Sequence, residues 1–221
     1  MSSRVSTRMR SSITSLLAAG CLLTSSGCIQ MMLTGAFLFK GMETPPEFEE
    51  LKGSKTAIVC RPLVELQYSG SDAADELARQ LGGLMKMKIS KIDIVSPQKI
   101  EQWTDEHEWE SFLDVGRAVK SDYVVGIDLE EFSLYQGQTI FQGRAVVSVK
   151  VYDVKKKGSG PVYEKTLPRY VYPPSGGIAT ADKSEEQFRR EFIALLADRI
   201  GHSFYAWDPR DEAAIDALAL D

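Results

Sequence analysis

The stretch GRAVKSDYVVGID, from Gly116 to Asp128, decides the fold, because it joins a helix to a strand where the pattern of the chain changes. Apolar residues at helical spacing end within it, at Gly116 and Val119. From Tyr123 to Leu129, apolar side chains alternate with the residues between them, which is typical of a strand with two different faces. The stretch therefore predicts the end of a helix followed by the start of a long strand.

Upstream of this junction, the sequence predicts alternating strands and helices. Ala57-Ile58-Val59-Cys60 is a continuous apolar run, which is typical of a strand buried on both faces, and residues 92–95 form a second run. A stripe of apolar residues at helical spacing follows Ser71. Ser96-Pro97 predicts the start of another helix, with a capping hydroxyl before a proline at the first helical position.

Downstream of the junction, the sequence predicts three strands and a last helix. The apolar set slips by one position near Glu130-Glu131, which predicts a bulge, because one extra residue restores the buried face. Residues 136–139 have the composition of a hairpin connection, and the strand that follows has one polar face. Residues 162–172 predict a third strand, and Ser184 with Gln187 predicts a capping box for the last helix.

The predicted order is therefore β-α-β-α-β-β-β-α, which indicates an α/β fold with a mixed sheet in two or three layers. We expect a single domain over residues 55–207, followed by an acidic tail over residues 208–221.

This stretch also resembles a known signature. Residues 116–128, with 145–153 and 162–165, are similar to a pattern of bacterial periplasmic domains: a helix, alanine or serine, an acid, tyrosine, a strand with glycine, then a val-x-val-x-val-tyr-asp strand. The curli-secretion lipoprotein, the lipoprotein activators of penicillin-binding proteins and the N-terminal domain of the Tol translocation protein share it, as do uncharacterised bacterial lipoproteins. Its motifs determine fold, so the resemblance implies an envelope module that binds protein partners without known enzymatic chemistry.

The first 27 residues have the three parts of a bacterial lipoprotein signal peptide. Three arginines between Arg4 and Arg10 form a positive n-region, residues 13–24 form a short apolar h-region, and residues 25–27 are small. Cys28 follows directly and is the predicted lipidation site. Acyl chains such as palmitate on this cysteine would anchor the protein to a membrane.

Two alternatives to this signal remain open. Cys21 also follows small residues, although a cut there would leave an h-region near the lower limit of length. An uncleaved anchor is the other alternative, because no charged residue occurs from Ser11 to Phe39 and this length can span a bilayer, although polar residues at 24–27 interrupt it. Both alternatives leave the arginines inside and the domain outside.

The predicted export signal and the net charge of the domain limit where the protein lies and what it can bind. We expect residues 28–54 to form a lipidated tether and linker, with the domain facing the periplasm. Ile29 after Cys28 slightly favours the outer membrane over the cytoplasmic membrane. Loss of residues 1–27 removes three arginines and no acid, so the formal net charge changes from −5 to −8. Because such an acidic domain repels phosphate backbones, we expect no nucleic-acid partner. We expect instead a protein partner in the envelope. The oligomeric state stays open.

The sequence predicts no catalytic, cofactor or metal site. The two histidines, His107 and His202, lie far apart in the sequence, and a zinc site needs three or four converging ligands. Cys60 is the one cysteine left in the mature domain once Cys28 is acylated, so no internal disulfide can form. Its apolar neighbours favour a packed thiol over a reactive one.

A candidate partner-binding surface comes from the aromatic and proline residues at the end of the last predicted strand. Aromatic side chains beside an open sheet edge suit docking by strand addition. The alternative is that the rings cover the sheet and the prolines protect its edge. The candidate residues are Tyr163, Tyr170, Tyr172, Pro173 and Pro174.

Three functions of different class follow from these observations. The first is a membrane-anchored, non-enzymatic interaction or assembly module of the cell envelope. The second is a subunit of an oligomeric export pore, which would require the apolar segment 31–39 to insert in the bilayer with its neighbours. The third is an enzyme with an unrecognised carboxylate site, for which Asp128 and Glu130 are the candidate acids.

Overall fold

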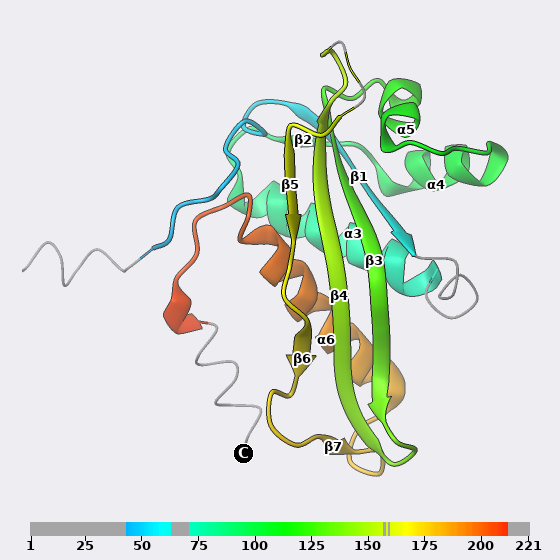
Figure 1. Cartoon of the computed structure of the whole chain (residues 1–221), viewed down its shortest axis with the longest axis vertical. Coiled ribbons are helices and arrows are strands. Elements are labelled where there is room, and N and C mark those ends of the chain that lie inside the picture. Colours follow the sequence, from blue (N-terminus) through cyan, green and yellow to red (C-terminus); the bar gives the residue numbers. More distant parts are fainter. Residues whose placement is uncertain (1–42, 63–70, 157, 159, 212–221) are drawn as a thin grey trace, which may run out of the picture. The chain divides into compact units, whose positions relative to one another are not determined.

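The computed structural model describes residues 43–62, 71–156, 158 and 160–211. The export signal and both candidate lipidation sites, Cys28 and Cys21, lie outside the described residues. Within the described residues, helices lie on both faces of one mixed sheet (Figure 1). This arrangement confirms the predicted α/β class with a mixed sheet.

The sheet combines parallel and antiparallel pairing in the predicted order. Its strands follow the spatial order β2-β1-β3-β4-β5, and β6 and β7 pair with other parts of β4. β1 is parallel to β2 and β3, whereas β4 is antiparallel to β3, β5, β6 and β7. The strands are β1 (Lys55–Pro62), β2 (Asp93–Ile94), β3 (Tyr123–Gln136), β4 (Ile140–Asp153), β5 (Tyr163–Thr166), β6 (Tyr170–Tyr172) and β7 (Ile178–Ala179).

Two pairs of helices cover the sheet unequally. α3 (Ser71–Lys88) and α6 (Glu185–Gly201) pack against each other behind the sheet in Figure 1. α4 (Pro97–Glu106) and α5 (Phe112–Val119) lie at the upper right, on the other face, where they pack against β1 and β3. Most of the buried apolar side chains, including those of Phe188 and Phe192, belong to the α3 and α6 side. A smaller core around Phe112 lies on the α4 and α5 side.

The junction stretch forms the predicted helix-to-strand turn. α5 ends at Val119, and its cap residue Lys120 adopts the left-handed backbone conformation at φ 56° and donates its N–H to the Arg117 and Gly116 carbonyls. A Cβ at Gly116 would meet the Val124 side chain and lie 2.8 Å from the Val154 side chain. Glycine is therefore required where the helix crosses close to the strands that follow.

The bulge in β3 is also confirmed. Its register against β4 shifts between Leu129 and Glu131, so that Glu130 has no direct partner on the neighbouring strand. The hairpin connection lies between Gln136 and Ile140, and Gly137 adopts a positive φ of 71° there. The capping box of α6 is present as predicted, from Ser184 and Gln187.

Three local predictions need correction. Residues 162–172 form two strands, β5 and β6, with Pro168 between them; a proline has no N–H to donate to a sheet ladder. The Ser96 hydroxyl donates to Gln98 Oε1 at 2.6 Å and does not cap α4, although the helix does begin at Pro97. The two-residue strand β7 was not predicted, because so short a strand carries no periodic signal.

Candidate functional site

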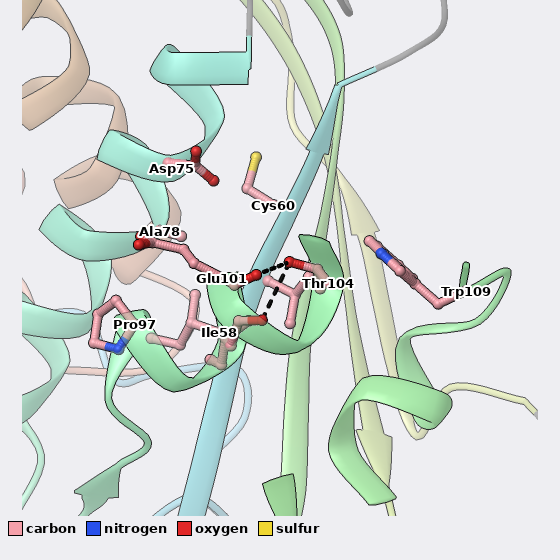
Figure 2. A pocket seen from close by; sticks show the side chains of 10 residues that line it. Ile58, Cys60, Asp75, Ala78, Pro97, Glu101, Thr104 and Trp109 are labelled. Carbon is pink, nitrogen blue, oxygen red and sulfur yellow. Dashed lines mark hydrogen bonds between the residues drawn. The ribbon is translucent and has the colours of Figure 1, made fainter. Parts of the chain in front are cut away.

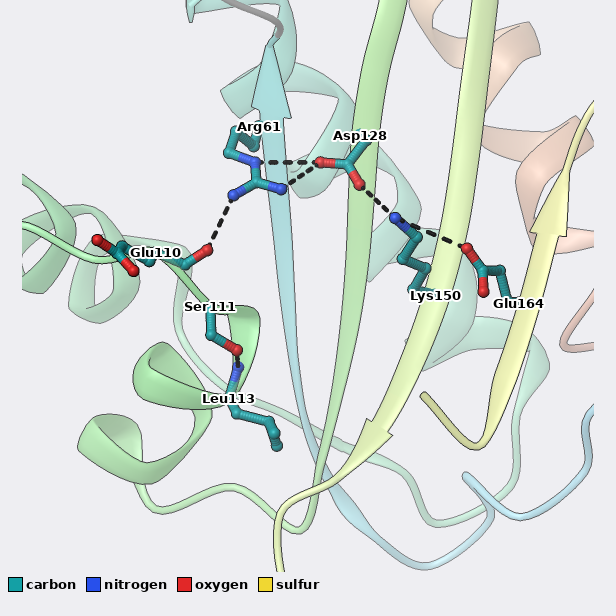
Figure 3. Close-up of polar contacts among 7 residues, drawn as sticks. All are labelled: Arg61, Glu110, Ser111, Leu113, Asp128, Lys150 and Glu164. Carbon is teal, nitrogen blue, oxygen red and sulfur yellow. Dashed lines mark hydrogen bonds and ion pairs between the residues drawn. The ribbon is translucent and has the colours of Figure 1, made fainter. Parts of the chain in front are cut away.

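The sheet face opposite α3 and α6 carries the candidate functional site, and we call it the open face. In Figure 1, α5 lies near one end of the long β3–β4 hairpin, and no described helix lies in front of the rest of this hairpin. Charged side chains cross this face from strand to strand at one level of the sheet (Figure 3). The crossing residues are Arg61 of β1, Asp128 of β3, Lys150 of β4 and Glu164 of β5.

The four side chains form a continuous row of alternating charge, as Figure 3 shows. Asp128 Oδ1 accepts hydrogen bonds from Arg61 Nε at 3.1 Å and from an Arg61 terminal nitrogen at 2.8 Å. Asp128 Oδ2 accepts from Lys150 Nζ at 3.0 Å, and Lys150 lies 3.7 Å from a Glu164 oxygen. Both oxygens of the central carboxylate are therefore held by cations.

Burial strengthens this row at its centre. The Asp128 side chain is 10% exposed, whereas that of Glu164 at the end of the row is 55% exposed. The hydrogen bond to Asp128 raises the pKa of Lys150, against the opposing effect of its partial burial. Because the central charges are paired and partly withdrawn from water, the row fixes strands β1, β3 and β4 relative to one another.

The guanidinium of Arg61 also ties the sheet to the connection between α4 and α5. Its central carbon lies 4.8 Å from the centre of the Phe112 ring and 5.6 Å from that of the Trp109 ring. One terminal nitrogen donates to the Glu110 carbonyl at 3.1 Å. These contacts are typical of a cation held by aromatic faces, so Arg61 is a structural residue as well as a surface charge.

The sequence prediction named Asp128 but missed the rest of this row. The sequence predicts one polar face for the strand that contains Lys150, but the partner of this lysine cannot be assigned without the strand register. Arg61 lies 67 residues from Asp128 along the chain. The structure does not support a shared role for Asp128 and Glu130, because Glu130 is exposed at the bulge while Asp128 is buried and bonded to cations.

A small cavity of about 50 Å³ lies between β1, α3 and α4 (Figure 2). Its lining includes Ile58, Cys60, Asp75 and Thr104. The Thr104 hydroxyl already donates to the Ile100 and Glu101 carbonyls of its own helix. A space of this size can hold a few ordered water molecules.

The thiol of Cys60 beside this cavity is not activated. Burial raises the pKa of Cys60, and the negative charges of Asp75 and Asp128 raise it further. Burial also raises the pKa of Asp75, with a smaller contribution from Glu101. Because the thiolate is the nucleophilic form, a thiol that keeps its proton at neutral pH suits a packing role.

The three tyrosines of the candidate partner-binding surface turn toward the core. Tyr170 stacks on Phe192 with the ring centres 5.9 Å apart, and Tyr172 is buried with its hydroxyl donating to Glu191 at 2.7 Å. Tyr163 packs against Phe48, 5.6 Å between ring centres. The tyrosines thus cover the sheet on its α6 side.

The two prolines differ from each other in exposure. Pro173 is buried and follows a cis peptide bond from Tyr172, whereas Pro174 is exposed. No described strand pairs with the outer side of β5, but Glu47 covers part of it by accepting hydrogen bonds from Tyr163 and Lys165. Pro174 therefore lies at the surface after β6, whereas the tyrosine rings pack against core phenylalanines.

The part of the chain that the structure describes offers neither a metal-binding cluster nor a helix that could span a membrane. No group of three or more His, Cys, Asp or Glu side chains that could hold a metal ion occurs among the described residues. His107 stacks on Trp103 and His202 stacks on Trp207, in different parts of the fold. Among the helices of the described residues, none has the length and apolar character needed to cross a membrane.

Comparison with known proteins gives structural neighbours at low similarity. Neither a protein-family model nor a curated protein matches the sequence. The PelC dodecamer from Paraburkholderia phytofirmans is 14% identical with a TM-score of 0.39, covering 74% of this chain and 95% of that one. Lipoprotein GNA1162 from Neisseria meningitidis is 8% identical with a TM-score of 0.39, covering 68% and 99%.

A third neighbour is the LpoB C-terminal domain from Salmonella enterica, which is 13% identical with a TM-score of 0.36 and covers 54% of this chain and 83% of that domain. At these identities and scores, no functional residue can be carried from the neighbours to this chain. The solved structures to which the chain is similar include bacterial lipoproteins, which is the group suggested by the resemblance of its sequence.

Proposed function

We propose that this protein is a membrane-anchored extracytoplasmic lipoprotein whose domain acts as a non-enzymatic interaction or assembly module of the cell envelope. In this proposal residues 1–27 are a signal peptide, residues 28–54 a lipidated tether, residues 55–207 the domain and residues 208–221 its tail. The lipid is carried by Cys28. The observation that carries the proposal is the export signal ending at this cysteine, ahead of an α/β domain.

The open face supports a binding role for the domain. Its central acid is bonded to two cations, and the neighbouring Cys60 thiol has a raised pKa, so neither group is arranged for nucleophilic or acid–base chemistry. A polar sheet face of this kind offers alternating charges to a partner, and complementary charges give such contacts specificity. We place the partner on this face, with the exposed Pro174 at its edge.

The anchor is tested by metabolic labelling with a palmitate analogue in the bacterial host. The full chain is expected to incorporate the label and to float with membranes, and Cys28→Ala is expected to lose both properties. Cys21→Ala is the matched control and should label normally. Labelling that is lost in Cys21→Ala and kept in Cys28→Ala would assign the lipid to Cys21. Wild-type protein that takes up no label would refute lipidation.

The binding face is tested by inverting charges while keeping an ion pair. Glu131 and Arg169 form an exposed pair between β3 and the residue before β6, and the register places Glu131 on the open face. The double variant Glu131→Arg/Arg169→Glu retains the pair but reverses the pattern that a partner meets. The control is Arg79→Glu/Glu101→Arg, which inverts an exposed pair between α3 and α4.

The measurement is a crosslinking pull-down from native membranes with the anchored protein. The open-face variant is expected to lose its crosslinked partners and the helix-side control to keep them. Equal recovery in both variants would remove the open face from the proposal. Light scattering in mild detergent then separates a tethered module from the pore alternative, because a ring of fixed stoichiometry would favour a pore subunit.

A further inference from the structure

The lysines of this acidic protein are distributed unevenly between the two ends of the sheet. β1, β2 and β3 begin at the same end, where β4 finishes, since Lys55 is paired with Asp93, Thr56 with Tyr123, and Tyr123 with Asp153. We call it the lysine-rich end. The lysines on the segments that meet there, or hydrogen-bonded to them, are Lys52, Lys55, Lys86, Lys88, Lys91, Lys99, Lys120, Lys155 and Lys156.

Some of these lysines have an explanation within the fold. Lys55 Nζ and Lys99 Nζ both donate to the Val119 carbonyl at the end of α5, at 3.3 and 3.4 Å, and Lys155 Nζ lies 2.5 Å from an Asp122 oxygen. Lys86 and Lys88 lie in the last turn of α3. Cations at a helix C-terminus are favoured by the helix dipole, which accounts for four of these five lysines without any ligand.

The remaining lysines of this end have no partner within the described protein, and among them only Lys120 lies at a helix end, as the C-cap residue of α5, where the helix dipole also favours a cation. Among the described residues, the exposed ammonium groups of Lys52, Lys91, Lys120 and Lys156 have no hydrogen bond or ion pair with a protein group. The described lysines away from this end are all paired, and these pairs are Lys150 with Asp128, Lys165 with Glu47 and Lys183 with Glu191. Unpaired lysine charge is thus concentrated at one end of the sheet.

The chain also enters the domain at this end. Phe48 packs edge-on against Tyr123, the first residue of β3, with ring centres 6.1 Å apart, and the Tyr123 hydroxyl donates to Glu50 at 3.3 Å. The segment arriving from the N-terminal side therefore joins the domain beside the lysine-rich end. A tether attached to a membrane would bring this end of the domain toward that membrane.

Acidic neighbours limit the attraction without cancelling it. Asp122 is engaged by Lys155 and by the Lys55 backbone N–H, and Asp153 accepts from the backbone N–H groups of Lys155 and Lys156. Other exposed acids nearby are Glu49, Glu50 and Asp93. The four unpaired lysines lie on four separate connections at this end of the sheet, before β1, before β2, before β3 and after β4.

We propose that the lysine-rich end is a docking surface for anionic phospholipid headgroups, which orients the anchored domain with its β1–β3 starts toward the membrane. This inference rests on the proposed lipid anchor. A lysine ammonium is a compact charge that suits phosphate oxygens, and basic residues beside an anchored segment add to the binding of the acyl chains. The open face would then extend away from the bilayer surface and remain accessible to a partner.

The test is lysine footprinting on the full lipidated chain in vesicles. Amine acylation is compared between vesicles of neutral phosphatidylcholine and vesicles containing about one third phosphatidylglycerol, with flotation confirming that the protein is anchored in both. The labelling of Lys52, Lys91, Lys120 and Lys156 is expected to fall about fivefold in the anionic vesicles. The protection should disappear at high salt, and Lys183 serves as the internal reference.

Variants make the footprint specific. Lys52→Glu/Lys91→Glu/Lys120→Glu should abolish the protection of Lys156 while the circular dichroism spectrum stays unchanged. Gln136→Glu/Gln138→Glu, at the hairpin tip on the opposite end of β3, is the control and should leave the protection intact.

Each other outcome overturns the proposal. If the protein floats with both kinds of vesicle and its lysines are labelled equally in both, lipid docking is refuted but the anchor is not. If the protein does not float, the proposed function itself is refuted. The same protection produced by free inorganic phosphate would indicate a soluble-anion site. Protection that extends to Lys183 would indicate general occlusion rather than a lysine-rich docking surface.

Discussion

On β4, the side chains of Ala145, Val147 and Val149 belong to the core that contains the phenylalanines of α6, whereas Arg144 and Lys150 lie on the opposite, open face. The two faces use the same backbone ladder but stabilise it differently. One removes apolar area from water, and the other pairs charges that remain near water. Alternate residues of one strand therefore supply the apolar core and the charged surface.

The largest expected effect is on the apolar face. Phe188 is fully buried and stacks on Phe141, with ring centres 5.1 Å apart. Phe188→Ala should reduce the free energy of unfolding by about 3–5 kcal/mol, because it removes buried apolar area and leaves a cavity. Urea denaturation followed by circular dichroism measures this. Ile140→Ala, at a partly exposed position, is the control, and a loss below about 1 kcal/mol at Phe188 would contradict the assignment.

The next largest effect is at the centre of the ionic row. Asp128→Ala leaves Arg61 and Lys150 without their shared anion, but both cations keep contact with water, at 39% and 26% exposure. We therefore expect a loss of about 2 kcal/mol, below the range for a fully buried pair. The triple variant Arg61→Met/Asp128→Leu/Lys150→Met should recover most of it. A triple variant less stable than Asp128→Ala would show that the charges themselves are required.

At a third site, near the end of α6, we expect the contribution of one carboxylate to stability to depend on pH. The hydrogen bond with His202 lowers the pKa of Asp198, assisted by the Tyr205 hydroxyl and opposed by burial. A carboxyl whose folded pKa is lowered stabilises the protein above its unfolded pKa of about 4, and this contribution is lost as the pH falls through the folded pKa. The difference in melting temperature between wild type and Asp198→Asn should therefore shrink below about pH 4. A constant difference from about pH 7 to about pH 3 would contradict the linkage.

The smallest effect is expected at an exposed ion pair of the open face. The Arg169 side chain is 61% exposed, and that of its partner Glu131 is 33% exposed. Arg169→Gln should change the free energy of unfolding by less than about 0.5 kcal/mol, since exposed pairs are screened by water. Thermal denaturation at low and high salt measures this. A loss of stability as large as that of Asp128→Ala would contradict the expectation that buried ion pairs of the open face stabilise the fold more than its exposed pairs.

Local patterns were sufficient to predict most of the fold. The alternation after Tyr123, the slip at Glu130-Glu131 and the capping box at Ser184 each depend on residues close together in the sequence, and each is found in the structure. The interruption of residues 162–172 was missed, although Pro168 carried a signal for it.

The candidate site was less predictable, because it depends on register and on which side each ring turns. Arg61 meets Asp128 only once β1 has paired with β3, and no local pattern encodes that pairing. The tyrosines at 163, 170 and 172 were correctly placed on late strands. Their inward orientation follows from packing against Phe48, Phe188 and Phe192, which lie outside those strands.

The parallel pairing of β1 with β3 has a consequence for the order in which the fold assembles. β1 is synthesised first, yet its partner across the Arg61–Asp128 contact arrives 67 residues later, whereas β3 and β4 are joined by a short turn. Closing the shorter loop costs less chain entropy, so the β3–β4 hairpin is favoured as the folding nucleus and β1 is added late. Until then, the side of β3 that will receive β1 is an open edge, which can pair with strands of other chains.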